Sequence, residues 1–231
     1  MPSAQFIRPM FDAIAGKYDF LNDLLSLFLH RRWKSKLVKQ ALTKNPKSIL
    51  DAATGTGDLT FRFLGKSSSV QLTAIDFSSE MIRQSQKKLL HVSKEQQKQV
   101  TFEVQNVEQL PYQDQSFDVS TISFGIRNVE HLELALAELA RVSKKGLYIL
   151  EFGKPQNPFI SKLIFYFLRS FVPTLGRLTK KPEAYHYLLD SSEKFPSGPN
   201  FLNILKKNTP FKTFKYETFF GGFVYLYSAE F

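Results

Sequence analysis

Short segments rich in β-branched and apolar residues alternate with amphipathic segments over the first two thirds of the chain. The short segments predict strands and occupy residues 48–53, 70–76, 100–106, 117–123 and 147–152. Between them, apolar residues recur three and four positions apart, as in 129–143, which predicts helices. Strands that alternate with helices typically form a parallel sheet with helices on both faces. The pattern therefore predicts an α/β, doubly wound fold.

The two ends of the chain depart from this pattern. Helical patterns precede the first strand and follow the fifth, so we expect an N-terminal helical extension and an insertion before the last two strands. Within the insertion, 159–171 predicts a helix, and the proline-containing stretch 173–200 predicts irregular structure. Gly221 and Gly222 separate the two closing strands, which predicts a hairpin with an antiparallel last strand at the sheet edge.

Composition excludes several kinds of site. The chain of 231 residues has no cysteine and four scattered histidines, so we expect neither a disulfide nor a metal site. The net charge of +10 suits nucleic acid, an anionic membrane surface or an anionic substrate, but it equally suits a solvated basic face. No apolar stretch reaches the roughly 20 residues of a spanning helix, and no secretory signal is visible. We expect a cytoplasmic protein, with peripheral contact at the inner face of the membrane as an open alternative.

The stretch LDAATGTGDLT, residues 50–60, has the form of a strand, a glycine-rich turn and a helix start. Gly55 and Gly57 let the backbone pass close to a ligand, and the helix start offers free N–H groups. Thr60 stands where a dinucleotide-binding fingerprint has its third glycine, which argues against NAD. The chain also lacks the GxxxxGK[ST] sequence that holds a triphosphate.

Polar residues at the ends of the next two predicted strands narrow the choice of ligand. Asp76 lies 19 residues after Gly57, where α/β folds place a carboxylate that accepts hydrogen bonds from a ribose. Asn106, with the next backbone N–H, could bracket the edge of an adenine ring, although either residue alone could be an ordinary turn residue. Asp51 and Asp58 flank the glycine turn and suit a ligand with positive charge. S-adenosylmethionine, which carries a sulfonium and an ammonium but no phosphate, fits best.

Four stretches stand in an order that closely resembles the ubiquinone/menaquinone biosynthesis C-methyltransferases, at residues 11–34, 50–60, 122–131 and 184–191. The resemblance covers nearly the whole chain. It implies a class I, Rossmann-like methyltransferase that moves a methyl group from S-adenosylmethionine to a ring carbon of a prenylated quinol. It also implies one domain, 1–231, made of a helical entry segment, a cofactor-binding core, a helical lid or substrate region and closing strands, at 1–45, 46–153, 154–210 and 211–231.

The family's cofactor-binding positions carry over residue by residue onto this chain. They fall on Thr56, Asp76, Asn106, Val107 and Ser123, in addition to the turn residues Asp51, Gly55 and Gly57. Two positions depart from the family. The turn SKKGLY replaces the usual Pro-Gly-Gly, and Tyr227 stands where the family usually has a histidine.

Arg127 and Asn128, in the stretch FGIRN, follow the fourth predicted strand. Methylation of a quinol carbon needs electron density, which the ring supplies once a neighbouring hydroxyl is deprotonated. We expect Arg127 to stabilise the phenolate or relay its proton through water, and Asn128 to orient the ring. A salt bridge from Arg127 to Glu130 or Glu151 is the structural alternative.

The substrate is expected to contact aromatic and amide side chains of the flanking helices. As part of a lid over the substrate, Tyr18, Asn22, Tyr185 and Tyr187 would help to close the ring pocket, although Tyr18, at the end of a helix, equally suits packing. The predicted helix 159–171 has one apolar face, which favours either core packing or a lid over an isoprenoid tail that rests on a membrane, where nearby basic residues such as Lys162 and Arg169 could meet anionic headgroups.

Several functions stay open at this point. The favoured reaction is demethylmenaquinol to menaquinol, because the compact chain carries no targeting extension, and the benzoquinol of the ubiquinone pathway is the alternative. An RNA methyltransferase would suit the basic charge, but we expect no nucleic acid because no RNA-binding module is visible. A non-catalytic lipid-binding protein is the third reading, and a homodimer stays open.

Overall fold

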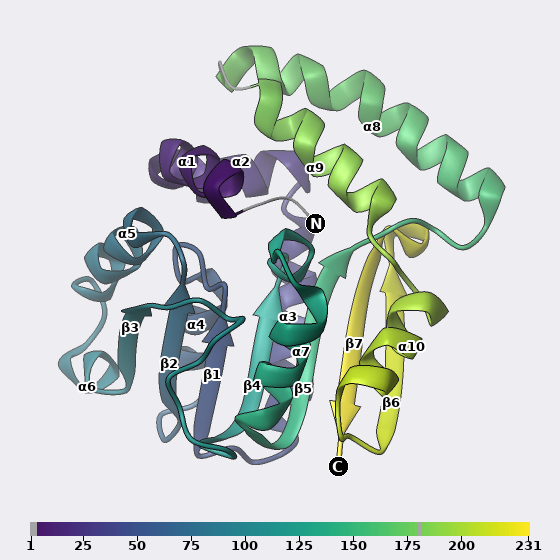
Figure 1. Ribbon diagram of the computed structural model, residues 1–231. Coiled ribbons are helices and arrows are strands. Elements are labelled where there is room, and N and C mark those ends of the chain that lie inside the picture. Colours follow the sequence, from purple (N-terminus) through teal and green to yellow (C-terminus); the bar gives the residue numbers. More distant parts are fainter. Residues whose placement is uncertain (1–3, 180–181) are drawn as a thin grey trace.

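The computed structural model describes the backbone of residues 4–179 and 182–231, and their side chains except at 4–6, 17, 25 and 171–186. The centre of the molecule is a seven-stranded sheet in the order β3-β2-β1-β4-β5-β7-β6 (Figure 1). The strands are β1 (Ser48–Ala52), β2 (Gln71–Asp76), β3 (Val100–Val104), β4 (Phe117–Ser123), β5 (Ser143–Phe152), β6 (Thr213–Phe219) and β7 (Val224–Glu230). β1 to β5 are parallel, and β7 is antiparallel to β5 and β6. The predicted doubly wound sheet and antiparallel last strand are confirmed.

Helices surround this sheet. They are α1 (Ala4–Ile14), α2 (Tyr18–Leu25), α3 (Leu29–Leu42), α4 (Asp58–Leu64), α5 (Ser79–Leu89), α6 (Lys94–Gln97), α7 (Leu132–Arg141), α8 (Pro158–Thr179), α9 (Pro182–Lys194) and α10 (Pro199–Asn208), with short 3₁₀ turns η1 (Ala15–Lys17), η2 (Ile126–Asn128) and η3 (Phe220–Gly222). Ser78 caps α5, as its side chain predicts, by accepting a hydrogen bond from the backbone N–H of Met81 at 3.1 Å.

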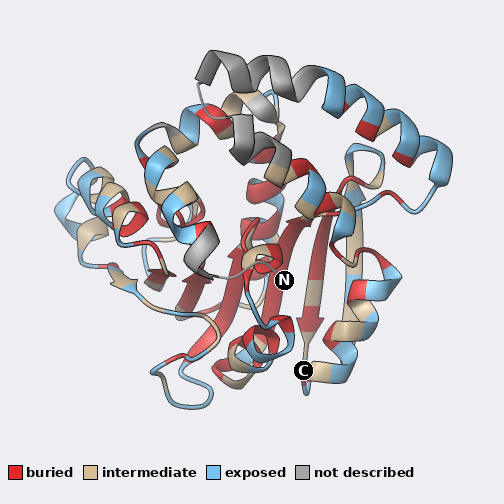
Figure 2. Ribbon diagram, turned by 45° about the horizontal axis from the view of Figure 1, so that its top comes forward, coloured by how far each residue is buried: buried red, intermediate tan, exposed pale blue. Residues whose placement is uncertain are grey.

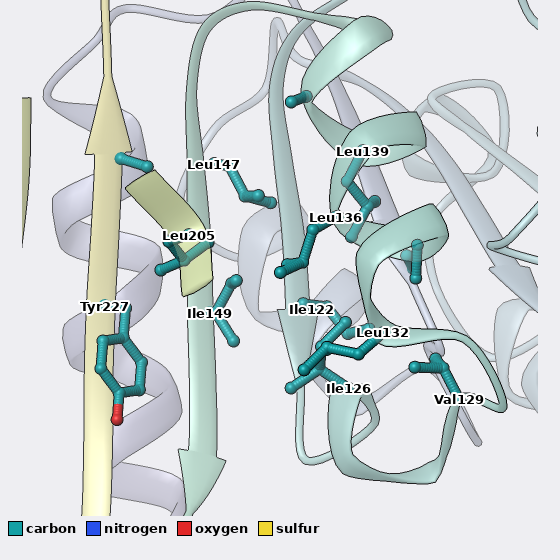
Figure 3. Close-up of a cluster of buried hydrophobic side chains, with 14 of the residues drawn as sticks. Ile122, Ile126, Val129, Leu132, Leu136, Leu139, Leu147, Ile149, Leu205 and Tyr227 are labelled. Atoms are coloured by element: carbon teal, nitrogen blue, oxygen red, sulfur yellow. The ribbon is translucent and has the colours of Figure 1, made fainter. Parts of the chain in front are cut away.

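The sheet is buried on both faces because successive strand residues point to opposite sides. Ile49 of β1 belongs to the apolar cluster under α3 and α4, and its neighbour Leu50 belongs to the cluster under α7 and α10. Figure 3 shows the second cluster, in which Leu136 of α7 faces Ile122 of β4 and Ile149 of β5. This continuous burial, visible as the red strands in Figure 2, explains why the strands read as apolar runs in the sequence.

The carboxyl ends of the parallel strands all meet one edge of the sheet, where ligands of α/β proteins bind. Helices α1, α2, α8 and α9 lie beyond this edge (Figure 1). The N-terminal helices and the helices α8 and α9 therefore stand on the same side of the molecule, although more than 100 residues separate them in the chain. No helix in the described parts of the chain combines the length and the apolarity needed to cross a bilayer.

The prediction of irregular structure over 173–200 is wrong. Helix α8 continues to Thr179, α9 covers most of the following stretch, and α10 begins at Pro199. Pro182 and Pro199 are the first residues of their helices, where a missing backbone N–H breaks no intrahelical hydrogen bond. These prolines start helices, whereas the sequence pattern was interpreted as a sign that helices are absent.

Candidate active site

A cavity of about 470 Å³ lies at the carboxyl ends of β1 to β4. Its lining comes from the loops that follow these strands and from the N-terminal helices, and it includes Gly55, Asp76, Asn106, Val107, Ser123 and Asn128. Phe11 and Tyr18 close it from the side of α1 and α2. The volume falls within the roughly 300–1,000 Å³ of small-molecule sites.

The glycine turn takes its shape from left-handed backbone conformations. The φ angles are 59° at Gly55 and 82° at Gly57. A Cβ atom on Gly57 would lie 2.8 Å from the ring of Phe61, so a side chain there would have to displace that ring in addition to adopting a positive φ. This turn directs the backbone N–H of Gly55 toward the end of β2, where it donates to Asp76 Oδ2 at 2.8 Å.

Asp76 is held with one backbone hydrogen bond on each carboxylate oxygen. Besides the bond from Gly55, the N–H of Ser78 donates to Oδ1 at 2.9 Å. Burial raises the pKa of this carboxyl to about 6, against the two backbone donors that favour the ionised form. Each oxygen retains acceptor capacity on the side of the cavity that Asp76 lines, which suits two vicinal ribose hydroxyls.

Two further groups fit an adenosine ligand. The Asn106 side-chain oxygen accepts the N–H of Glu108 at 3.0 Å, which fixes the loop that presents Val107 to the cavity. The hydroxyl of Ser123 is buried and has no hydrogen-bond partner among the described residues. An unmet hydrogen bond at a buried hydroxyl costs about 1–3 kcal/mol, and Ser123 contributes to the cavity wall. The residues present therefore fit S-adenosylmethionine.

Three of the predicted cofactor residues do not line this cavity. Gly57 shapes the turn, and the buried Thr56 donates its hydroxyl to Asp19 of α2. Asp51 lies beneath the turn and accepts hydroxyl hydrogen bonds from Thr54, Thr60 and Thr121, at 2.8, 2.7 and 3.1 Å. Thr60, in the position of the missing third glycine, thus ties the start of α4 to β1.

A second cavity, of about 140 Å³, adjoins the first. Phe11, Tyr18 and Phe124 line both cavities and form the wall between them. The second cavity is lined mainly by apolar side chains from α1–α3, the ends of β4 and β5, α8, α9 and the η3 region, among them Trp33, Phe152 and Phe223. Tyr18 and Asn22 both line it. Burial raises the pKa of Tyr18 despite the cations of Lys34 and Arg127 nearby.

Arg127 reaches the apolar cavity from a buried ion pair. Its Nη1 donates to Glu151 Oε1 at 2.5 Å and to the carbonyl oxygen of Phe124 at 2.8 Å, while its backbone N–H donates to Glu151 Oε2 at 3.2 Å. The guanidinium also lies 5.3 Å from the centre of the Phe152 ring. The salt bridge to Glu151 and a place in the cavity wall are therefore compatible, because Glu151 holds the guanidinium where it lines the cavity.

Asn128 and Tyr187 connect the two cavities. The phenol of Tyr187, in the wall of the apolar cavity, donates to Asn128 Oδ1 at 2.9 Å, and Asn128 lines the polar cavity. Because the phenol proton is donated to Asn128, any further hydrogen bond at the Tyr187 oxygen is one that the oxygen accepts. Tyr185 lies in α9 among the residues whose side chains the structure does not describe.

Sequence reasoning missed His30, which lines the apolar cavity. Ser26 Oγ donates to the carbonyl oxygen of Asn22 at 2.6 Å and lies 2.7 Å from His30 Nδ1. Since the hydroxyl has a single proton, Nδ1 must be the donor to Ser26, and Nε2 of the neutral ring is left as an acceptor. Burial and the neighbouring Lys34 lower the His30 pKa to about 4, so the ring is neutral at pH 7.

The spacing of residues in α3 indicates from sequence that one face of this helix lines a cavity. His30, Trp33 and Lys34 are buried at positions three and four apart, on the face of α3 that turns toward the cavity. Lys34 pairs with Asp58 at 2.9 Å, and Arg62 also binds that carboxylate, so Asp58 is occupied by the chain's own cations. The stretch HRRWK is therefore partly a cavity wall and not only a basic surface.

Tyr227 lies away from both cavities. It is buried between β7 and α10, where its hydroxyl accepts the N–H of Gly198 at 2.7 Å (Figure 3). Its ring packs on Phe201 of α10, with ring centres 4.7 Å apart. The departure from the family histidine thus falls in the core of this protein.

The sheet order, the antiparallel last strand and the polar cavity at the strand ends define a class I methyltransferase that uses S-adenosylmethionine. Solved structures agree on the fold. A SAM-dependent methyltransferase of Thermotoga maritima superposes with a TM-score of 0.62 at 19% identity, over 96% of this chain and 98% of that one. A SAM-dependent methyltransferase of Aquifex aeolicus has a TM-score of 0.53 at 18% identity, over 79% and 81% of the two chains.

Sequence comparison identifies the family. The model of the ubiE/COQ5 methyltransferase family matches residues 2–230, and the chain belongs to this family. The ubiquinone/menaquinone biosynthesis C-methyltransferase UbiE of Bdellovibrio bacteriovorus is 39% identical over 99% of this chain and 97% of its own length. UbiE of Rickettsia massiliae is 37% identical over 96% and 91%. The protein is an S-adenosylmethionine-dependent C-methyltransferase, as its sequence predicts.

Proposed function

We propose that this enzyme methylates a ring carbon of a prenylated quinol in respiratory quinone biosynthesis, and that its substrate is demethylmenaquinol. The observation that carries the proposal is the pair of adjoining cavities, one polar and one apolar, separated only by Phe11, Tyr18 and Phe124. Methyl transfer needs donor and acceptor in contact, and this arrangement suits a polar methyl donor beside an apolar ring. The names of the relatives at 37–39% identity support a quinone pathway.

A fused ring system suits the lining of the apolar cavity. Trp33, Phe124 and Phe152 contribute aromatic faces from α3, the end of β4 and the end of β5. A naphthoquinol offers more flat area to such faces than a single ring does. The benzoquinol of the ubiquinone pathway would bury less of this surface, so we favour the naphthoquinol.

The enzyme must increase electron density at the ring carbon. When bound, S-adenosylmethionine supplies an electrophilic methyl group. Arg127, held by Glu151, is a fixed cation in the cavity wall and would stabilise the phenolate formed when the neighbouring quinol hydroxyl loses its proton to water. With that donor bound, a new carbon–carbon bond would form as the sulfur–carbon bond breaks, and the ring would regain its aromaticity when the methylated carbon loses its proton and the neighbouring carbonyl oxygen takes one up, so one proton would be released overall.

Asn128 and Tyr187 would orient the ring. The two side chains share a hydrogen bond, and Tyr187 lines the apolar cavity, where its phenol suits contact with a quinol hydroxyl. Tyr18 and Asn22 would close the same cavity from the N-terminal side, and Tyr185 stays a prediction from the sequence. For the cofactor, Asp76 would hold the ribose and Asn106 with Val107 the adenine.

The test is methyl transfer from labelled S-adenosylmethionine to two reduced acceptors, demethylmenaquinone and the corresponding benzoquinone of the ubiquinone pathway. Label in the naphthoquinol, with at least tenfold less in the benzoquinol, is the expected result. The reverse ratio would replace the proposed substrate by the benzoquinol. Transfer to neither acceptor, with cofactor binding demonstrated by calorimetry, would contradict the quinol assignment.

A further inference from the structure

His30 is a buried polar residue in the wall of the apolar cavity that the mechanism above does not use. It is 6% exposed and lies in the first turn of α3, on the cavity-lining face that also carries Trp33. Its Nδ1–H donates to Ser26 Oγ, because the Ser26 proton goes to the carbonyl oxygen of Asn22. The other ring nitrogen, Nε2, therefore carries the free lone pair and can only accept a hydrogen bond.

The Nε2 atom of His30 has no hydrogen-bond partner among the described residues. Two carboxylate oxygens lie near it, on Asp58 and Asp23, but at 3.7 and 3.8 Å they are beyond hydrogen-bond distance. The atom is also not sealed inside the protein, since the Ser123 hydroxyl is the one fully buried side-chain polar atom without a partner in the part of the chain that the structure describes. Nε2 is thus an unsatisfied acceptor beside open space, and the apolar cavity is that space.

The charges around His30 keep the ring neutral. Each carboxylate near Nε2 is already paired with the chain's own cations, Asp23 with Arg31 and Asp58 with Lys34 and Arg62. Burial and the neighbouring Lys34 lower the His30 pKa to about 4, so the ring stays unprotonated at Nε2 across the physiological pH range. The cavity wall therefore presents a permanent hydrogen-bond acceptor.

A hydrogen-bond acceptor distinguishes the two redox forms of the ring. A quinol carries two hydroxyl groups, which donate hydrogen bonds, whereas a quinone carries two carbonyl oxygens, which only accept them. Only the quinol has the electron density that methylation needs. Arg127 cannot tell the two forms apart, because hydroxyl and carbonyl oxygens both accept from a guanidinium. The distinction requires an acceptor on the protein, and His30 supplies one.

We propose that His30 selects the reduced ring: its Nε2 accepts a hydrogen bond from the quinol hydroxyl opposite the one at Arg127, whereas a quinone carbonyl would face it with a lone pair. The inference rests on the proposed function, because it takes a quinol as the occupant of the apolar cavity. A site whose buried polar group is left unpaired rejects the ligand that lacks the matching group. Ser26 is the positioning residue, since its hydroxyl fixes the tautomer that leaves Nε2 unprotonated.

The test measures the affinity of the protein for menadione, a naphthoquinone without a prenyl tail, and for its reduced form menadiol, without S-adenosylmethionine. Trp33 is the only tryptophan in the chain and lines the cavity, so quenching of its fluorescence reports binding. The chain has no cysteine, so the quinone forms no thiol adduct, and the dithionite that keeps the quinol reduced breaks no disulfide. The variants are His30→Gln and Ser26→Ala, and His91→Gln, at an exposed histidine, is the matched control.

The wild type and His91→Gln should bind menadiol at least tenfold more tightly than menadione, with a ratio that is constant between pH 6 and 8. His30→Gln should bring the two affinities within about threefold of each other, because a side-chain amide both donates and accepts. Ser26→Ala should lower the ratio as well, since the ring can then carry its proton on Nε2 and donate it to a carbonyl. A purely structural role of either residue would change both affinities together and leave their ratio unchanged.

Circular dichroism and the Kd for S-adenosylmethionine check that each variant is folded, since neither His30 nor Ser26 lines the polar cavity. If His30→Gln does not fold, Ser26→Ala decides. Equal affinity of the wild type for both redox forms overturns the inference, as does a wild-type ratio in the folded variants. The proposed function then stands, provided that the wild type methylates demethylmenaquinol. A wild type that binds neither form and methylates no quinol contradicts the proposed function, and the selection by His30 with it.

Discussion

The two adjoining cavities are built in opposite ways. The polar cavity is made of loops that follow four neighbouring strands, and its groups are positioned by backbone hydrogen bonds such as those from Gly55 and Ser78 to Asp76. The apolar cavity is assembled from many separate segments, among them the N-terminal helices, the ends of β4 and β5, α8, α9 and η3, and its walls are side chains that touch only in the folded protein. Arg127 illustrates this dependence, because it is positioned by Glu151, 24 residues away on β5.

The difference teaches that cofactor binding and ring chemistry are separable in this enzyme. Variants in the strand-end loops should change cofactor affinity, and variants in the appended helices or the Arg127–Glu151 pair should change turnover. Phe11, Tyr18 and Phe124 are the exceptions, since they belong to both cavities. The predictions for the ion pair, Asp76 and Ser123 test whether this separation holds.

The largest effect is expected at the buried ion pair. Arg127→Gln alone leaves the carboxylate of Glu151 buried without a counter-ion, which should lower the free energy of unfolding by about 3–5 kcal/mol. The double variant Arg127→Gln, Glu151→Gln removes both charges and should recover most of that stability. If Arg127 stabilises the phenolate, turnover of the double variant stays about 10²–10³-fold below wild type, while calorimetry finds cofactor affinity within about twofold. Wild-type turnover in a stable double variant would make the pair purely structural.

A pH-dependent effect is expected at Asp76. The carboxyl must be ionised to accept two ribose hydroxyls, and its pKa is raised to about 6. Below that pH, binding must first remove a proton, so the Kd for S-adenosylmethionine should rise about tenfold per pH unit. Asp76→Asn should weaken binding about 10- to 100-fold at pH 7.5 and abolish the pH dependence. Calorimetry between pH 5 and 8 measures the Kd of the wild type and of Asp76→Asn. If the Kd of the variant changed with pH as steeply as that of the wild type, the titration would belong to another group.

The same contrast explains what could be predicted from sequence. The glycine turn, Asp76 and Asn106 were found because each lies next to its own strand end, so that local pattern and position coincide. The position of Asp51 beneath the turn could not be predicted, because the three threonine hydroxyls that donate hydrogen bonds to its carboxylate come together only in the folded protein. His30 was missed for a related reason, since its hydrogen bond to Ser26 and its burial depend on the α2–α3 turn.

His30, a titratable group in the wall of the apolar cavity, should affect the stability of the protein. The His30 pKa is lowered to about 4 in the folded protein, against the ordinary 6.5. The unfolded chain therefore binds the extra proton between these values, and the free energy of unfolding should fall as pH drops from 6.5 to 4, by at most about 3 kcal/mol. His30→Gln should flatten this part of the urea-denaturation profile, whereas His91→Gln, at an exposed position, should not.

The smallest effect is expected at Ser123, whose unsatisfied hydroxyl lowers the stability of the cofactor-free protein. The buried hydroxyl has no partner among the described residues, so Ser123→Ala should raise the unfolding free energy of the cofactor-free protein by about 1 kcal/mol. The same change should weaken S-adenosylmethionine binding about fivefold, because the ligand then loses a hydrogen bond.

Ser143→Ala is the matched control for that measurement. Ser143 is buried as well, but its hydroxyl bonds to Ser120 Oγ at 2.7 Å and to the carbonyl oxygen of Leu139 at 2.6 Å, so its removal should lower stability and leave cofactor affinity unchanged. Opposite signs for the two serines would identify the Ser123 hydroxyl as a group kept for the ligand. A loss of stability in both variants, with cofactor affinity unchanged, would make Ser123 an ordinary core residue and remove it from the cofactor site.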